Sequence, residues 1–344
     1  MGRYIEKIFI NGCSHTEKVT SGTTDIECGK YSNVDDRGFI SKNDWIEYSN
    51  SIGKQYQFKD SYFNSTGSVL DKYNSIFKLN YSLLIDWAQH FYFYNKLVLQ
   101  QDTVSYSNHE FQKNQYPSIY QKNYVVLDKI KDTPYILNFG KSGKGNDYMF
   151  METISTIEQL KDKNEKPELA IIQLSGLNRR MGIKPSDKNI DDLYNVDGSH
   201  IFFATPWDVT DFKELAPPPL GEMTTLFNIY ALQEYFKSNS IKYLFLNYFP
   251  LTDIIKNQFI YNKINKEHFI TFDDSDDISE GWIDKMKSKE GIRFVRDLQG
   301  HPSTTGYLYM FHRILCKLNK LYDMNYQVIP SYNQIFLKSN KNLL

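Results

Sequence analysis

Five residues of the types that carry out acyl transfer by serine occur in short polar turns, each after an apolar run. Ser14 supplies a hydroxyl, His301 an imidazole and Asp297 a carboxylate, while Gly143 and Asn178 supply a backbone N–H and a side-chain amide. A serine nucleophile needs a base for its proton, an acid to orient that base, and donors for the oxyanion. The candidate catalytic residues are therefore Ser14, His301 and Asp297. The candidate oxyanion hole combines the backbone N–H groups of Ser14 and Gly143 with the Asn178 amide.

Each of these residues also has an ordinary structural explanation. A serine between a strand and a helix is commonly a helix cap, and the glycine-rich run at 140–145 is typical of a tight turn. An asparagine after a strand often forms a turn through its side chain, and a histidine at a helix start needs no chemistry. What singles these residues out is their joint order, because each follows a predicted strand.

The apolar runs that precede these turns have the length of buried strands. They are Ile8–Ile10, Tyr135–Phe139, Leu169–Leu174, Tyr243–Phe249 and Ile292–Val295. Amphipathic helical segments separate them, and this alternation is typical of parallel βαβ units. We therefore expect a flavodoxin-like three-layer α/β/α sandwich with about five parallel strands. Its polar turns would line the carboxyl edge of the sheet, where such proteins bind ligands.

Helical spacing predicts the elements between these strands. The expected helices are Leu83–Phe91, a segment after Gly145 capped by Asn146 or Asp147, about Thr224–Lys237, and about Thr304–Tyr322. In the second of these, the residues predicted to share one apolar face are Phe150, Met151, Ile154, Ile157 and Leu160. Pro217–Pro219 predicts a loop. We expect one domain over residues 1–322, with pocket-shaping insertions at about 17–131 and 179–223 and a tail at 323–344.

Composition narrows the class of protein. The 40 basic and 41 acidic residues nearly cancel, which argues against a nucleic-acid partner or a membrane surface bound through bulk charge. Cys13, Cys28 and Cys316 form neither an even disulfide set nor a metal-ligand spacing, and the seven histidines show no paired spacing. We therefore expect no metal and no cofactor. No window approaches a membrane span, and the first residues lack the apolar core of a secretory signal, so we expect a cytoplasmic or phage-encoded protein.

Four short blocks carry a resemblance to a known family. The run Gly12-Cys13-Ser14-His15-Thr16 resembles the first conserved block of SGNH (GDSL-like) hydrolases. Asn138 with 142–146 is similar to the second block, 176–178 to the third, and 297–303 to the last. This resemblance implies a metal-independent serine esterase that acts through an acyl-Ser14 intermediate. Its substrate would be a small-molecule or glycan ester, with an acyl or acetyl group carried on a carbohydrate or lipid.

The chain departs from the family pattern at three places. Cys13 stands where the family's namesake motif has Asp, and Arg179 follows Asn178 where an Asp is common. Asp297 precedes His301 by four residues, whereas three is the usual interval. The acid contributes less than the base in this family, so hydrolysis is compatible with the unusual spacing.

Other functions compete for the same residues. A phosphate-binding loop ending in Gly140-Lys141-Ser142 would need glycine at position 135, which is Tyr135, so that motif fails. Cys13 as a thiol nucleophile is disfavoured, because alternation along a strand sends neighbouring side chains to opposite faces. Two alternatives stay open: an inactive SGNH-like scaffold used for binding or assembly, and an acyltransferase with an acceptor other than water.

Overall fold

The chain falls into two compact units in the computed structural model. One unit comprises Ile5–Glu17 and Asp102–Gly281, and the other comprises Met1–Tyr4, Lys18–Gln101 and Trp282–Leu344. Two compact units can belong to one folding domain, so the expected single domain over 1–322 stays a prediction. The structure describes residues 4–13, 16, 87–88, 91, 94–95, 99, 101–107, 130–140, 144–177, 180–185, 194–196, 199–204, 218–251, 253–273, 277–286, 302 and 304–326.

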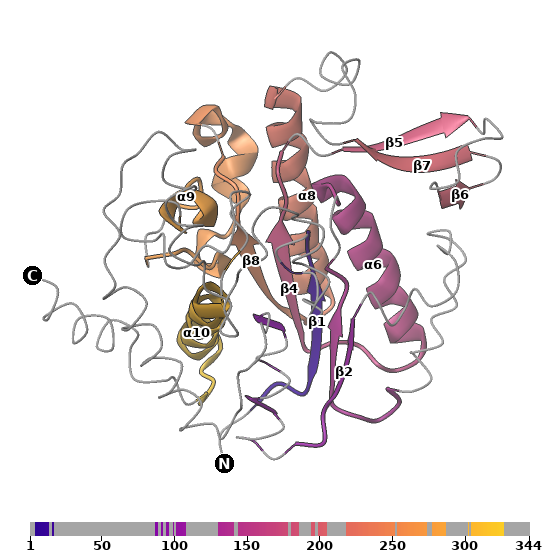
Figure 1. The fold of residues 1–344 in the computed structure, drawn as a ribbon, viewed down its shortest axis with the longest axis vertical. Helices are drawn as coiled ribbons and strands as arrows, with labels where there is room; N and C mark the ends of the chain where they lie inside the picture. Colours follow the sequence, from indigo (N-terminus) through magenta and orange to yellow (C-terminus); the bar gives the residue numbers. More distant parts are fainter. Residues whose placement is uncertain are drawn as a thin grey trace, which may run out of the picture. The chain divides into compact units, whose positions relative to one another are not determined.

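A five-stranded, all-parallel sheet forms the centre of the first unit (Figure 1). Its strand order is β2-β3-β1-β4-β8, and the strands are β1 (Lys7–Asn11), β2 (Val104–Ser107), β3 (Tyr135–Asn138), β4 (Leu169–Leu174) and β8 (Lys242–Asn247). Both faces of β3 and β4 are buried along their whole length, as continuous apolar runs require. The α/β class with a flavodoxin-like parallel sheet is therefore confirmed.

One of the five strands differs from the expected set. The strands β3, β1, β4 and β8 follow the flavodoxin order 2-1-3-4. The fifth is β2, which lies inside the predicted insertion at 17–131 and pairs with β3 from Val104 to Ser107. At the opposite edge Phe269 forms a parallel bridge with Phe245 of β8. The predicted strand Ile292–Val295 lies outside the described residues.

Two helices pack together on one face of this sheet, namely α6 (Asn146–Asp162) and α8 (Pro218–Ser238). α6 makes the crossover from β3 to β4, and α8 precedes β8 (Figure 1). The core that they share with the sheet includes Phe9, Leu137, Ile172, Phe245, Ile157, Leu160, Leu226, Ile229 and Phe236.

The start of α8 differs from the prediction. Pro218 and Pro219 form part of the first helical turn instead of a loop. Proline suits that position, because the first backbone N–H groups of a helix have no intrahelical partner.

A second sheet stands in the predicted insertion at 179–223. It is antiparallel, in the order β5-β7-β6, and its strands are β5 (Arg180–Pro185), β6 (Tyr194–Val196) and β7 (Ser199–Ala204). β5 follows β4 closely in the chain and lies against α6. Between β8 and the end of this unit the chain forms three short 3-10 helices: η2 (Asp253–Asn257), η3 (Phe259–Lys263) and η4 (Lys266–His268).

The described part of the other unit includes helices. It contains α9 (Trp282–Met286) and α10 (Thr304–Tyr322), and α10 has the bounds that its apolar spacing predicts. Aromatic contacts hold this unit together: Phe311 meets Phe91 edge to face with 4.9 Å between ring centroids, and Tyr94 contacts both Phe311 and Tyr326. The predicted helix around Leu83–Phe91 agrees with the helical, buried Trp87, Ala88 and Phe91.

Candidate active site

Three of the candidate residues follow strands of the parallel sheet in the sequence, just after each strand ends at its carboxyl edge. Ser14 follows β1, Gly143 follows β3 and Asn178 follows β4, and these strands are neighbours in the order β3-β1-β4. Their ends lie in close register, because Asn138 pairs with Ile10 and Ile172 pairs with Asn11. Ser14, Gly143, Asn178, Asp297 and His301 all lie outside the described residues. Their mutual geometry therefore stays a prediction. The structure does describe residues that neighbour them in the sequence, and the contacts of these residues are given below.

The turn that contains Ser14 is held by both neighbouring strands. Within the turn, the Thr16 N–H donates to the Cys13 carbonyl at 2.9 Å. From β3, the Asn138 side chain donates to the Thr16 carbonyl at 2.7 Å. From β4, the oxygen of the Gln173 side chain accepts the Thr16 hydroxyl, and its Nε2 donates to Cys13 Sγ at 3.2 Å. Residues on both sides of Ser14 are thus fixed to the sheet.

Gly12 has no side chain, and the side chain of Thr16 occupies the space where a Cβ atom would lie. A Cβ atom at this position would lie 2.3 Å from the Thr16 hydroxyl oxygen and 3.0 Å from Gln173 Cβ. Real Cβ atoms do not approach other heavy atoms as closely as 2.3 Å, so the Thr16 side chain could not stay where it is if residue 12 carried a side chain.

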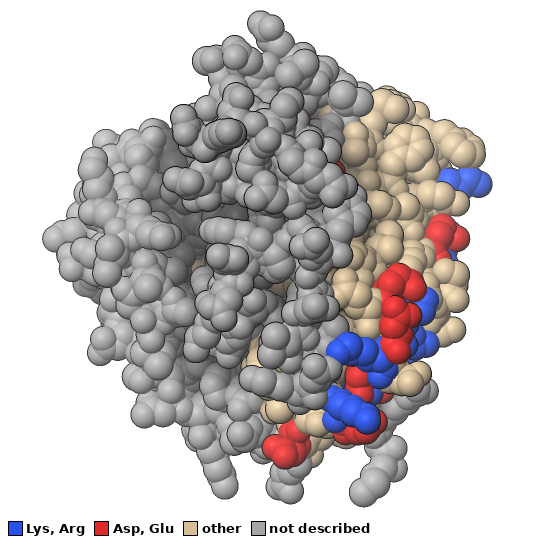
Figure 2. Space-filling model, turned by 90° about the vertical axis from the view of Figure 1, so that its right-hand side faces the viewer, with Lys and Arg blue, Asp and Glu red and all other residues tan. Residues whose placement is uncertain are grey.

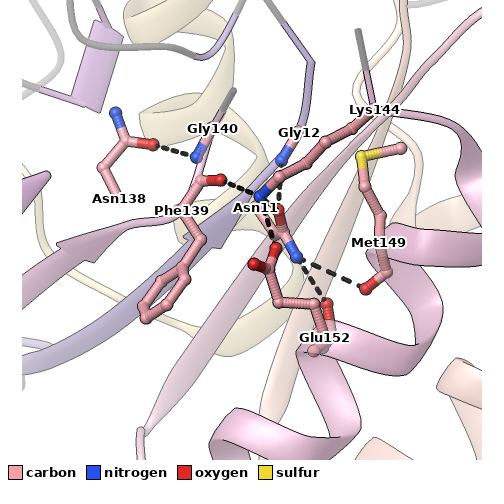
Figure 3. A network of polar contacts seen from close by, with 9 residues as sticks. Asn11, Gly12, Asn138, Phe139, Gly140, Lys144, Met149 and Glu152 are labelled. Carbon is pink, nitrogen blue, oxygen red and sulfur yellow. Dashed lines mark hydrogen bonds and ion pairs between the residues drawn. The ribbon is translucent and has the colours of Figure 1, made fainter. Parts of the chain in front are cut away.

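The loop that leads toward Gly143 is anchored at both ends (Figure 3). At its start, the Gly140 N–H donates to the Asn138 side chain at 2.8 Å. At its end, Lys144 turns back and donates from Nζ to the Phe139 carbonyl and to the Glu152 carboxylate on α6. Lys144 is 1 % exposed and Glu152 is 3 % exposed, so this ion pair is buried.

Asn11 connects the end of β1 to α6. Its Nδ2 donates to the Met149 carbonyl at 3.3 Å and to the Thr153 hydroxyl at 3.1 Å. Its Oδ1 accepts the N–H of Gly12 at 2.9 Å and lies 3.5 Å from Lys144 Nζ (Figure 3). A single carboxamide thereby joins the strand before Ser14 to the helix and to Lys144, the residue directly after Gly143.

Asn146 connects the end of β4 to α6 and α8. It is not the N-cap of α6, although the sequence predicts this role for Asn146 or Asp147. The N-cap of α6 is Gly145, and Asn146 is the first helical residue. The Asn146 side chain instead exchanges two hydrogen bonds with the backbone of Ser175, at 2.7 and 3.1 Å, and donates to the Thr225 hydroxyl on α8. It therefore holds the chain just beyond β4, before Asn178.

The buried face of α6 also differs from the predicted apolar face. Ile157 and Leu160 are buried as expected, and Phe150 and Ile154 are partly buried and pack against the same core, whereas Met151 is only partly buried. The helix also buries polar residues that include Glu152, Thr153 and Thr156. Glu152 and Thr153 bind Lys144 and Asn11, so the inward-facing part of the helix includes polar residues beside the apolar ones.

Sequence reasoning missed these supporting residues, although a signal was available. In the parallel sheet, each of the four strands other than β2 carries a carboxamide at or next to its last position, namely Asn11, Asn138, Gln173 and Asn247. All four are buried, and buried amides must find partners. An amide at the end of each apolar run therefore indicates a hydrogen-bonded network along that edge.

Cys13 lies inside this network. Its side chain is completely buried, and its sulfur accepts the hydrogen bond from Gln173. Reactive thiolates are found where a substrate has access and positive charge lowers the thiol pKa. The burial of Cys13 supports a packing role for this side chain.

Charged side chains gather at the edge of the sheet where the parallel strands begin. The ion pairs there are Lys7–Glu165, Lys161–Glu158 and Lys237–Glu234. On the face seen in Figure 2 such residues cluster over one part of the described surface.

Within the described part of the chain, no helix combines the length and the apolar character needed to cross a lipid bilayer.

Comparison with known proteins assigns no family to this chain. No model of a known protein family matches the sequence, and no curated protein matches it. The resemblance to SGNH hydrolases therefore rests on the four short sequence blocks and enters below as a proposal.

Proposed function

We propose that this protein is a serine esterase that hydrolyses an acyl or acetyl ester through an acyl-Ser14 intermediate. In this proposal His301 is the general base and Asp297 orients its imidazole. The backbone N–H groups of Ser14 and Gly143 and the side-chain amide of Asn178 stabilise the oxyanion. The resemblance to SGNH hydrolases favours a carbohydrate or lipid ester as substrate.

One observation carries the proposal. Three neighbouring parallel strands, β3, β1 and β4, end at the same edge of the sheet, and in the sequence each is followed within three to five residues by a residue that acyl transfer requires. The carboxyl edge of an open α/β sheet is where ligands bind. The described turns there are pinned by buried hydrogen bonds, and a catalytic group needs this kind of rigid support.

The proposed reaction has two steps. The Ser14 hydroxyl attacks the ester carbonyl while His301 takes its proton, and the carbonyl oxygen becomes an anion held by the three donors. The intermediate then breaks its bond to the alcohol, which leaves with the proton from His301. Water, activated by the same histidine, cleaves the acyl-Ser14 ester and regenerates the enzyme. Each oxyanion donor contributes on the order of 3 kcal/mol to the stability of the transition state.

A fluorophosphonate probe and p-nitrophenyl acetate test the proposal directly. We expect covalent labelling at Ser14 and turnover of the ester, and we expect Ser14→Ala and His301→Ala to lower turnover by at least about 10³-fold. Ser155→Ala is the matched control, because Ser155 lies half-buried on α6 and should leave labelling unchanged. A wild-type protein that neither labels nor turns over above the Ser14→Ala background contradicts the proposal. Labelling at Ser14 without hydrolysis would instead favour the acyltransferase alternative.

A further inference from the structure

A buried ion pair lies at the carboxyl edge outside the proposed catalytic set. Lys144 and Glu152 are almost completely buried, and their charged groups are in direct contact. Burying two charges is costly, and apolar residues of similar size often stabilise a protein at least as well. The pair is therefore poorly explained by stability alone.

The position of the ammonium group suggests what it does. Lys144 Nζ contacts the carbonyl of Phe139, the residue directly after β3, and lies 3.5 Å from Asn11 Oδ1 at the end of β1. It therefore ties the loop between β3 and α6 back to its own start and to the strand that precedes Ser14 (Figure 3). An apolar side chain could fill the same volume, but it could not hold these two oxygens.

We propose that Lys144 and Glu152 are a positioning pair that fixes the loop carrying Gly143 relative to the end of β1. This inference rests on the proposed function and deepens it. Glu152 holds the ammonium from α6, and the ammonium holds the Phe139 carbonyl and Asn11. Gly143 directly precedes Lys144 in the chain, so the pair sets where the Gly143 N–H stands relative to Ser14.

The test separates positioning from stability. In the double variant Lys144→Met/Glu152→Leu no charge is left buried and unpaired, so we expect an unfolding midpoint close to that of the wild type and well above that of either single variant. Turnover of p-nitrophenyl acetate should nevertheless show kcat lowered by about 10-fold to 100-fold, because a displaced oxyanion donor weakens binding of the transition state. KM should change much less. Hydrogen exchange at the Gly12 amide, which binds Asn11 Oδ1, should become faster.

Lys7→Met is the matched control. Lys7 pairs with the buried Glu165 at 2.7 Å at the other edge of the sheet, so this variant should lose stability and keep kcat. A double variant with kcat within twofold of the wild type overturns the positioning role while the proposed function stands. A wild type without Ser14 labelling or turnover overturns both, so the two failures are distinguishable.

Discussion

The hydroxyl of Thr16 donates a hydrogen bond to the side-chain oxygen of Gln173, which stands on the neighbouring strand β4. The nitrogen of the same amide donates to Cys13 Sγ. One buried side chain thereby holds both ends of the turn in which Ser14 lies. The described residues Cys13 and Thr16 are thus both bound by a residue distant in sequence, and the strength of this contact can be measured.

Thr16→Val and Gln173→Leu each remove one partner of this hydrogen bond. Because the other partner is then left buried and unpaired, we expect each variant to lower the free energy of unfolding by about 1–3 kcal/mol. The double variant should lose less than the sum, with a coupling energy of about 0.5–3 kcal/mol in urea denaturation. Strictly additive losses would show that the two side chains act independently.

Gly12→Ala is expected to displace the same turn. The new Cβ would collide with the Thr16 side chain, so the free energy of unfolding should fall by about 1–3 kcal/mol. Gly176→Ala is the matched control just beyond β4, where a Cβ would meet no atom within 4 Å. That change should stay within about 0.5 kcal/mol. Equal losses in the two variants would contradict the close packing of the turn over Gly12.

The buried ion pair predicts a non-additive pattern in stability. Glu152→Leu alone leaves the Lys144 ammonium buried without its counter-charge, and we expect a loss of about 3–5 kcal/mol. Lys144→Met alone leaves the Glu152 carboxylate in the same situation. The double variant should recover to within about 1 kcal/mol of the wild type, as measured by chemical denaturation. If the double variant instead loses as much free energy of unfolding as the sum of the two single losses, the charges themselves stabilise the fold.

Stability at low pH should depend on the contact between Tyr235 and Glu158, which joins α8 to α6. Hydrogen bonds from the Tyr235 hydroxyl, at 2.6 Å, and from Lys161 lower the pKa of Glu158. A carboxyl with a lowered pKa in the folded state stabilises the protein above its ordinary pKa, and this contribution is lost as the pH falls through the folded value. Glu158 is 45 % exposed, so solvent screening limits the effect to about 0.5–1 kcal/mol.

Tyr235→Phe should therefore destabilise the protein at pH 7, and the difference from wild type should shrink between about pH 5 and pH 3. Tyr135→Phe is the matched control, because the Tyr135 hydroxyl donates to the backbone carbonyl of Glu165, which does not titrate. Its effect on the free energy of unfolding should stay constant over this range. Urea denaturation at several pH values gives both comparisons. A pH-independent loss for Tyr235→Phe would mean that Glu158 keeps its ordinary pKa.

The strand β2 illustrates why part of the fold escapes prediction from sequence. The run Val104-Ser105-Tyr106-Ser107 is short and half polar, so it carries no apolar signal like those of β1, β3 and β4. It becomes a strand because β3 offers an open edge with which its backbone can pair. The amphipathic α10, whose apolar residues recur at helical spacing, was predicted with its observed bounds.

The α/β class, four of the parallel strands and the order in which polar turns follow them could be predicted from the amino-acid sequence. Long apolar runs and helical spacing are local patterns, so they can be recognised without the fold. Three features became visible only in the folded chain: α6 turns Glu152 and Thr153 inward, Gln173 binds both Cys13 and Thr16, and Lys144 binds the Phe139 carbonyl and Glu152. These features depend on which buried donors and acceptors meet across the sheet edge, and that pairing is set by the register of strands far apart in the chain.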